Sequence, residues 1–135
     1  MRLITKASLC SGCLSCMTVC STVNDGYSSL ASSRIEIELD EFGGDNRIFV
    51  CRQCAEPDCA KACPVDAIYK DNALGVWRVD YGLCIGCREC VEACRFSAMF
   101  FDPLQRRVVK CELCAGRGSP ACVEACPTGA LRLKV

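Results

Sequence analysis

The sequence predicts a small α+β fold of short strands, hairpins and short helices, organised around bound metal. Three observations predict it. Sixteen cysteines among 135 residues are far more than a globular domain of ordinary composition contains. Several stretches between the cysteines alternate with period two, as half-buried strands do. No segment shows a helical pattern of ordinary length, so metal ligands rather than a large apolar core are expected to organise the chain.

The expected strands form hairpins between the cysteine groups. The segment SRIEIEL alternates apolar and polar residues and is followed by a turn-rich stretch and a second short strand. Helical single turns are expected inside the cysteine groups, and Trp77, Phe100 and Phe101 are expected in the core. The strand pairs are residues 33–39 with 47–50, 67–69 with 75–79, and 98–101 with 106–109.

The cysteines form four groups of four in two alternating styles. The first and third groups have the spacing C-x2-C-x2-C-x3-C. The second and fourth widen the gap before their third cysteine, place Pro57 or Pro120 two residues ahead of it, and end in Cys-Pro. This alternation indicates a duplicated unit. The groups are Cys10, Cys13, Cys16 and Cys20; Cys51, Cys54, Cys59 and Cys63; Cys84, Cys87, Cys90 and Cys94; and Cys111, Cys114, Cys122 and Cys126.

Metal binding is favoured over disulfide bridges, because bridges require an oxidising compartment. The N-terminal stretch MRLITKASLC has no apolar region or cleavage site of a secretory signal. No apolar run approaches the roughly 20 residues that span a bilayer. We therefore expect a cytoplasmic protein without a membrane span, whose thiols stay reduced.

The charge balance and the absence of histidine exclude other classes of function. Sixteen basic and sixteen acidic residues give a net charge of zero, without the basic stripe of nucleic-acid-binding proteins. The missing histidines remove Rieske-type and His-containing zinc sites, and the commonest general base near neutral pH. We expect no nucleic-acid partner and no catalytic residue in this chain.

The spacing favours iron–sulfur clusters over zinc. A structural zinc ion usually takes two C-x2-C pairs separated by a longer loop. Three thiolates in quick succession instead suit a cluster several ångström across, in which each iron takes one cysteine. The run C-x2-C-x2-C-x3-C-P is typical of bacterial ferredoxins, in which the fourth cysteine ligates the other cluster. Sixteen cysteines therefore predict four [4Fe–4S] clusters.

Residues beside the ligands have expected roles as well. Gly12 and Gly86, inside the tight groups, are expected to let the backbone turn close to the sulfurs. Five basic residues lie beside ligands in the sequence and are candidates for offsetting the negative charge of the clusters. The alternative interpretation of each is an ordinary surface charge in contact with solvent. The five residues are Arg52, Lys61, Arg88, Arg95 and Lys110.

Spacing permits two ways of pairing the groups into ferredoxin-like lobes. Neighbouring groups can pair in series, or they can nest, second with third and first with fourth. The short connection from Cys63 to Cys84 favours pairing of the middle groups. Nesting would also make the terminal segments 3–5 and 131–133 adjacent strands. The spacing favours nesting and leaves the series arrangement open.

Nearly the whole chain resembles the family of four-cluster iron–sulfur subunits of dimethyl-sulfoxide reductase-type enzymes. The family includes small subunits of formate dehydrogenases, hydrogenases, carbon monoxide dehydrogenase and tungsten aldehyde oxidoreductases. The resemblance implies two ferredoxin-like lobes with two clusters each, one from residues 1–32 and 103–135 and the other from residues 33–102. It rests on CSGCLSCMTVC, CRQCAEPDCAKACPVDAI, CIGCRECVEAC and CELCAGRGSPACVEACPTGAL.

The resemblance also implies nested ligand sets. All four cysteines of the third group are present, so no three-iron cluster is expected, and the short chain is most similar to compact cytosolic relatives. The implied sets are Cys10, Cys13, Cys16 and Cys126; Cys20, Cys111, Cys114 and Cys122; Cys51, Cys54, Cys59 and Cys94; and Cys63, Cys84, Cys87 and Cys90.

The expected function is electron relay within a larger cytosolic oxidoreductase. Clusters in so small a body lie close enough for electrons to pass between them. The resemblance implies a catalytic partner with a tungsten- or molybdenum-pterin site, for example for aldehyde or formate oxidation, and exchange with soluble ferredoxin or a flavin/NAD subunit. The alternatives are a free polyferredoxin, which usually has a highly acidic surface, and a redox sensor.

Overall fold

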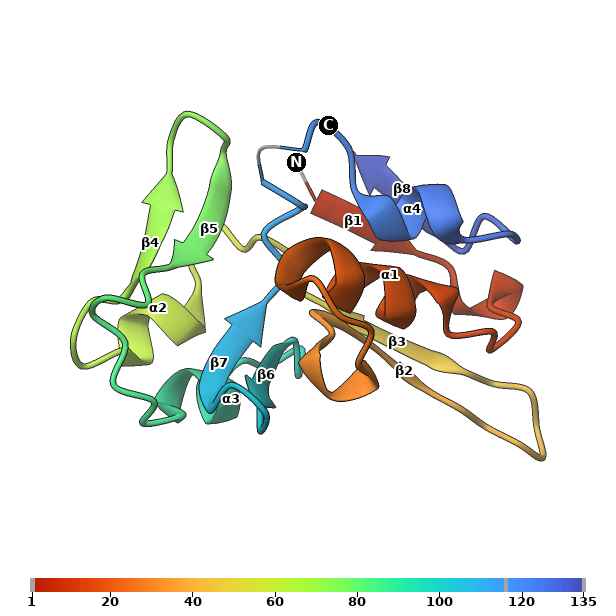
Figure 1. The fold of residues 1–135 in the computed structure, drawn as a ribbon, viewed down its shortest axis with the longest axis horizontal. Helices are drawn as coiled ribbons and strands as arrows, with labels where there is room; N and C mark the ends of the chain where they lie inside the picture. The colour runs from red at the N-terminus through yellow and green to blue at the C-terminus, as the bar shows by residue number, and fades with distance from the viewer. Residues whose placement is uncertain (1, 116, 135) are drawn as a thin grey trace.

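A computed structural model describes residues 2–115 and 117–134 of the chain (Figure 1). Short elements follow one another with brief connections, and every strand has four residues. The strands are β1 (Arg2–Thr5), β2 (Ile35–Glu38), β3 (Arg47–Val50), β4 (Ile68–Asp71), β5 (Val76–Val79), β6 (Met99–Asp102), β7 (Arg107–Lys110) and β8 (Leu131–Lys134). The α-helices are α1 (Ser15–Asp25), α2 (Asp58–Ala62), α3 (Glu89–Ala93) and α4 (Ala121–Ala125), with two 3-10 turns at Ala7–Leu9 and Leu30–Ser32.

The described strands pair as four two-stranded antiparallel sheets. Three are the hairpins β2–β3, β4–β5 and β6–β7, which confirms the predicted strand pairs with boundaries shifted by one or two residues. The fourth joins the two ends of the chain, because β1 pairs with β8 in the register Leu3 opposite Leu133. The predicted adjacency of the terminal segments is therefore confirmed.

Helix α1 is longer than the single turn predicted from the sequence, whereas α2, α3 and α4 are five-residue turns. Cys63 and Cys126 precede prolines, which disfavour helical backbone at the preceding residue, and α2 and α4 stop there. Cys20 is followed by Ser21, which permits helical backbone, and α1 runs for eleven residues from Ser15 to Asp25 with Gly26 as its C-cap. Helix α3 stops at Ala93 although Arg95, not proline, follows Cys94. Ser21 and its neighbouring hydroxyl side chains donate hydrogen bonds to carbonyls of the preceding turn, for example Thr22 Oγ1 to Thr18 O at 2.9 Å.

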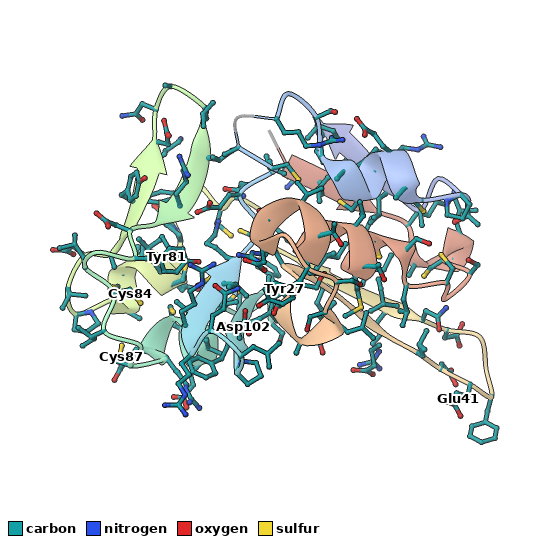
Figure 2. The ribbon with its side chains drawn as sticks, in the orientation of Figure 1. Tyr27, Glu41, Tyr81, Cys84, Cys87 and Asp102 are labelled. Carbon is teal, nitrogen blue, oxygen red and sulfur yellow. The ribbon has the colours of Figure 1, made fainter. Side chains whose placement is uncertain are left out.

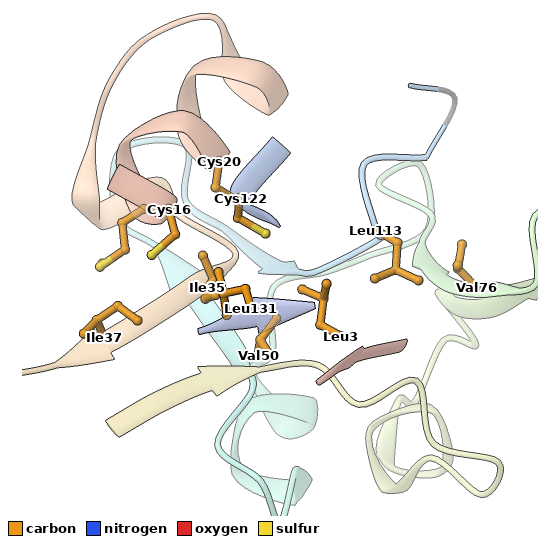
Figure 3. Close-up of a cluster of buried hydrophobic side chains, with 11 residues drawn as sticks. Leu3, Cys16, Cys20, Ile35, Ile37, Val50, Val76, Leu113, Cys122 and Leu131 are labelled. Atoms are coloured by element: carbon orange, nitrogen blue, oxygen red, sulfur yellow. The ribbon is translucent and has the colours of Figure 1, made fainter. Parts of the chain in front are cut away.

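Two hydrophobic clusters form the core. The larger contains Leu3 and Leu131 from the terminal strands together with Ile35 and Val50 from the β2–β3 hairpin (Figure 3). The smaller cluster contains Val108 together with residues of α2, α3 and the β4–β5 hairpin. Cysteine side chains belong to both clusters, namely Cys16, Cys20 and Cys122 in the first and Cys59 and Cys90 in the second.

The three aromatic residues expected in the core lie at its margin. Trp77 and Phe101 are half-buried and pack against the smaller cluster, and Phe100 is half-buried as well. Trp77 donates from Nε1 to the carbonyl of Cys54 at 2.9 Å. The edge of an apolar cluster suits an indole, because the ring packs on the cluster while its N–H reaches a backbone acceptor.

A buried ion pair ties the end of α1 to the residue before β2 and to β7. The carboxylate of Asp25, at the end of α1, accepts hydrogen bonds from Arg34 and, at 3.2 Å, from Arg107 of β7. The side chain of Asp25 is 2% exposed. The neighbouring guanidinium groups hold the pKa of Asp25 below its usual value, although burial of the carboxylate opposes this effect.

In the part of the chain that the structure describes, every helix is too short or too polar to cross a bilayer.

Candidate metal centres

Helix packing brings distant cysteine groups together. Helix α1 packs against α4, and α2 packs against α3. Because each helix carries the third cysteine of its group, the first group lies against the fourth and the second against the third. Figure 1 shows α2, α3 and the β4–β5 hairpin on one side of the molecule and α1, α4, β1 and β8 on the other.

Three cavities are each lined by four cysteines that come from two groups. The first cavity has a volume of about 270 Å³, and the second and third have volumes of about 10 Å³ each. The cysteines of the first are Cys51, Cys54, Cys59 and Cys94; those of the second are Cys63, Cys84, Cys87 and Cys90; and those of the third are Cys20, Cys111, Cys114 and Cys122.

The remaining four cysteines also lie near one another. Burial raises the pKa of Cys16 to about 11, and the nearby thiols of Cys10, Cys13 and Cys126 add to the rise. Cys13 is more exposed, and hydrogen bonds with Ser15 lower its pKa. The electrostatic influence of Cys126 on both Cys13 and Cys16 places it beside the first group.

Backbone amides donate hydrogen bonds to several of these sulfurs. The amide of Arg34 donates to Cys20 Sγ at 3.2 Å. The amide of Ala67 donates to Cys63 Sγ at 3.2 Å, four residues earlier. Further donors reach the sulfurs of Cys51, Cys94, Cys111 and Cys114. Such donors favour the negatively charged thiolate, which is the form that binds metal.

Comparison with known proteins identifies 4Fe-4S domains in this chain. A family model described as "4Fe-4S dicluster domain" matches residues 48–135, and one described as "4Fe-4S binding domain" matches residues 7–23. This chain belongs to the 4Fe-4S dicluster domain family.

Curated relatives include iron–sulfur and electron-transfer subunits. The chain is 40% identical to the NADH-dependent phenylglyoxylate dehydrogenase subunit beta of Aromatoleum evansii, over 91% of the chain and 28% of the relative. It is 38% identical to the protein NrfC of Escherichia coli (strain K12), over 92% of the chain and 60% of the relative. It is 34% identical to the thiosulfate reductase electron transfer subunit PhsB of Salmonella typhi, over 91% of the chain and 69% of the relative. The chain therefore spans under a third of the first relative and about three-fifths of the second.

Solved structures show the same fold. A chain of the active site complex BamBC of benzoyl coenzyme A reductase matches 96% of this chain and 76% of its own length, with a TM-score of 0.58 and 22% identity. The predicted α+β class and the predicted resemblance to iron–sulfur electron-transfer subunits are confirmed.

The donor set suits [4Fe–4S] clusters. Soft thiolates are the ligands that such clusters take, and each of the three cavities presents four of them and no histidine. Among the described residues, no three cysteine, aspartate or glutamate side chains converge closely enough to hold a single metal ion. The sulfurs thus stand apart from one another while lining a common space.

The five basic residues expected near the clusters have different environments. Lys110 is 2% exposed, and its Nζ donates to the carbonyls of Trp77 at 2.6 Å and Cys111 at 2.8 Å. Lys61 is exposed. The other three are held at the surface, where Arg52 stacks on Phe96, Arg88 stacks on Phe101 and Arg95 pairs with Asp58. Lys110 is the buried cation of this set.

Sequence reasoning missed two polar residues at the sites, of which Gln53 joins two cysteine groups and Asn24 contacts one. Gln53 donates from Nε2 to the carbonyl of Cys111 at 2.9 Å and accepts from the amide of Trp77 at 2.8 Å. Asn24 donates from Nδ2 to Cys20 Sγ at 3.6 Å. Gln53 lies inside a C-x2-C pair, which was the one available signal, but its contact with the fourth cysteine group depends on packing between segments far apart in the sequence.

Cysteine exposure differs between the sites. Cys13 and Cys87 are exposed, whereas the other cysteines are partly or fully buried. Figure 2 shows Cys84 and Cys87 at one end of the molecule, away from Glu41 at the tip of the β2–β3 hairpin.

Proposed function

We propose that the chain holds four [4Fe–4S] clusters and relays electrons within a larger oxidoreductase. The observation that carries the proposal is the lining of three cavities by four cysteines each, with the remaining four cysteines grouped around Cys16. The proposed ligand sets are site 1, Cys10, Cys13, Cys16 and Cys126; site 2, Cys20, Cys111, Cys114 and Cys122; site 3, Cys51, Cys54, Cys59 and Cys94; and site 4, Cys63, Cys84, Cys87 and Cys90.

Electrostatic interactions between thiols of different sets support a linear order. Cys16 of site 1 acts electrostatically on Cys122 of site 2. Cys111 of site 2 is likewise influenced by Cys51 of site 3. Cys59 of site 3 influences Cys90 of site 4. The order 1, 2, 3, 4 follows from these neighbours, and exposed Cys13 and Cys87 belong to the two terminal sites.

The protein residues have three tasks in this function. A bound [4Fe–4S] cluster supplies reversible one-electron chemistry at a potential that its surroundings tune. The cysteines anchor the clusters, and backbone donors such as the amides of Arg34 and Ala67 stabilise the sulfur charge. Lys110 places a buried positive charge between sites 2 and 3.

Sites 1 and 2 would form one lobe with residues 1–32 and 103–135, and sites 3 and 4 the other with residues 33–102. The packing of α1 on α4 and of α2 on α3 supports this division. The β2–β3 hairpin contributes to the same hydrophobic cluster as β1 and β8, which favours counting it with the first lobe.

We propose that the catalytic centre lies on a larger partner. PhsB is named as the electron transfer subunit of a thiosulfate reductase, and BamBC is named as the active site complex of benzoyl coenzyme A reductase. A tungsten- or molybdenum-pterin partner, with ferredoxin or a flavin/NAD subunit as the exchange partner, rests on the family resemblance. The balanced charge of the chain, with sixteen basic and sixteen acidic residues, favours a subunit over the alternative of a free polyferredoxin, which usually has a highly acidic surface.

Purification of the native protein from its host under anoxic conditions tests this proposal. Iron, tungsten, molybdenum and nickel are measured in the purified material. A stoichiometric large partner that carries tungsten, molybdenum or nickel is the expected result. A lone chain with about sixteen irons, four per cluster, and no other metal would instead identify a free polyferredoxin.

A further inference from the structure

One groove is lined by residues of β1 and β3 and by no cysteine. It has a volume of about 490 Å³ and is lined by all of β1, by residues 48–50 of β3, and by Arg52, Arg95 and Phe96. We call it the arginine groove. In the described part of the chain, β1 is hydrogen-bonded to β8 and β3 to β2, each along one edge. Among the described strands, the opposite edges of β1 and β3 are therefore unpaired and can accept a further strand.

The charge of the groove is positive. Arg2, Arg52 and Arg95 line it, and no carboxylate among the described residues does. Arg52 is held in place by stacking on Phe96, with its guanidinium carbon 4.2 Å from the ring centre. Arg95 pairs with Asp58 through one nitrogen at 2.8 Å, and the planar guanidinium group has further donors. An occupant with carboxylates would meet donors on both walls.

Apolar side chains set a second requirement. Ile4 and Phe49 line the groove among the arginines, and Ile4 is 42% exposed. A strand that alternates acidic and apolar residues presents its carboxylates on one face and its apolar side chains on the other. Such a strand can pair with a free edge through its backbone. On β1, Arg2 and Ile4 share one face and Leu3 lies on the other, so the strand would turn its carboxylates toward Arg2 and its apolar side chains toward the face of Leu3.

We propose that the arginine groove binds an extended acidic segment of the larger partner subunit, which adds as a strand beside β1 or β3. This proposal rests on the proposed function only for the identity of the occupant as a partner subunit. Arg52, Arg95 and Phe96 also line the cavity of site 3. The segment would therefore anchor the partner beside the middle of the relay and leave Cys13 and Cys87 free.

A labelled heptapeptide of alternating glutamate and valine tests the proposal on the iron-loaded protein. Binding is measured by fluorescence anisotropy. One control peptide replaces each glutamate with lysine, and another replaces the central valine with proline, which removes a backbone donor. We expect the acidic peptide to bind and both controls to bind much more weakly.

Three variants locate the binding. Arg2→Gln and Arg52→Gln are each expected to weaken binding by about two- to fivefold, as loss of one exposed ion pair does. Arg47→Gln is the matched control, because Arg47 lies on β3 outside the groove with its side chain 72% exposed. It is expected to leave binding unchanged. Arg2 is far in sequence from the nearest cysteine, so its variant keeps the test valid if Arg52→Gln loses iron.

Several results would overturn the proposal. They are absent binding of the acidic peptide, equal binding of the lysine or proline peptide, and an equal loss in Arg47→Gln. Analytical ultracentrifugation of the wild type tests whether a second copy of the chain occupies the groove. Self-association that Arg52→Gln abolishes would assign the groove to that second copy. Iron content, measured on every sample, reports separately on the four-cluster proposal, so failure of one is distinguishable from failure of the other.

Discussion

Each cysteine sulfur has its own environment, although the sixteen residues are chemically identical. Burial raises the pKa of Cys122 to about 12, and the nearby thiols Cys20 and Cys114 add to the rise. Cys13 has its pKa lowered by hydrogen bonding with Ser15. Thiols that are buried beside one another resist ionisation unless a positive centre lies between them. Bound iron therefore supplies the charge that this packing of thiols requires.

Replacement of a bridging cysteine tests the nested ligand sets. Cys20→Ser is expected to damage the cluster of site 2 and to spare sites 3 and 4, because Cys20 lines the same cavity as Cys111, Cys114 and Cys122. EPR spectra of the reduced protein, with iron content, provide the measurement. Loss of the signals of sites 3 and 4 in place of site 2 would reject nesting.

The buried charge of Lys110 is expected to influence the potentials of sites 2 and 3. Lys110→Met removes a positive charge beside Cys59 and Cys111 and is expected to lower at least one midpoint potential, on the order of tens of millivolts. Redox titration followed by EPR measures this shift. Lys61→Met is the matched control, because Lys61 is 62% exposed. Equal shifts in both variants would contradict a specific role for Lys110.

At the scale of the element, the repeated cysteine groups show repeated backbone conformations. Gly12 and Gly86 have φ of +78° and +72° at equivalent positions of the tight groups. Leu14 and Arg88, two residues later, are left-handed at the starts of α1 and α3. The predicted turns at the two glycines are thus present, and the duplicated pattern extends from the sequence to the backbone.

The two glycines differ in their surroundings, which makes them a matched pair for mutation. A Cβ on Gly12 would lie 2.9 Å from Leu39 Cδ2 and 3.3 Å from Asn46 Nδ2, whereas one on Gly86 meets nothing within 4 Å. Gly86→Ala is expected to cost about 1–2 kcal/mol from its backbone conformation alone. Gly12→Ala is expected to cost more, because the side chains of Leu39 and Asn46 must also shift. The temperature at which cluster absorbance is lost measures both, and a smaller loss in Gly12→Ala would contradict this account.

At the scale of the whole molecule, the clusters are expected to supply much of the folding free energy. The structure has four-residue strands and five-residue helices apart from α1, and cysteines belong to both hydrophobic clusters. Buried sulfurs that lose their iron leave unfilled space and unpaired polar groups. The apolar clusters alone are too small to compensate for the conformational entropy of the chain.

Removal of iron tests this dependence. Treatment with a chelator and reductant under anoxic conditions is expected to leave a largely unfolded chain, with loss of the cooperative thermal transition seen by circular dichroism. Reconstitution with iron and sulfide should restore the transition. A cooperative, native-like melt of the iron-free protein would show that the hydrophobic clusters are sufficient by themselves.

The sequence by itself determined the class of cofactor, the hairpins and the turns at Gly12 and Gly86. Each of these features depends on residues close together in the sequence. The cofactor class follows from three closely spaced cysteines, the hairpins from alternation with period two, and the turns from single glycines with positive φ. The sequence also predicted that the terminal segments pair, through the nested arrangement, although spacing alone left the series arrangement open.

The tertiary structure decided what depends on contacts between distant segments. It placed the first cysteine group against the fourth, extended α1 to Asp25, and brought Gln53 to the carbonyl of Cys111. It also buried Lys110 while leaving Lys61 exposed, although both adjoin or lie near a cysteine in the sequence. The physical reason is that burial and hydrogen bonding are properties of the assembled surfaces, and local pattern carries no information about which surfaces meet.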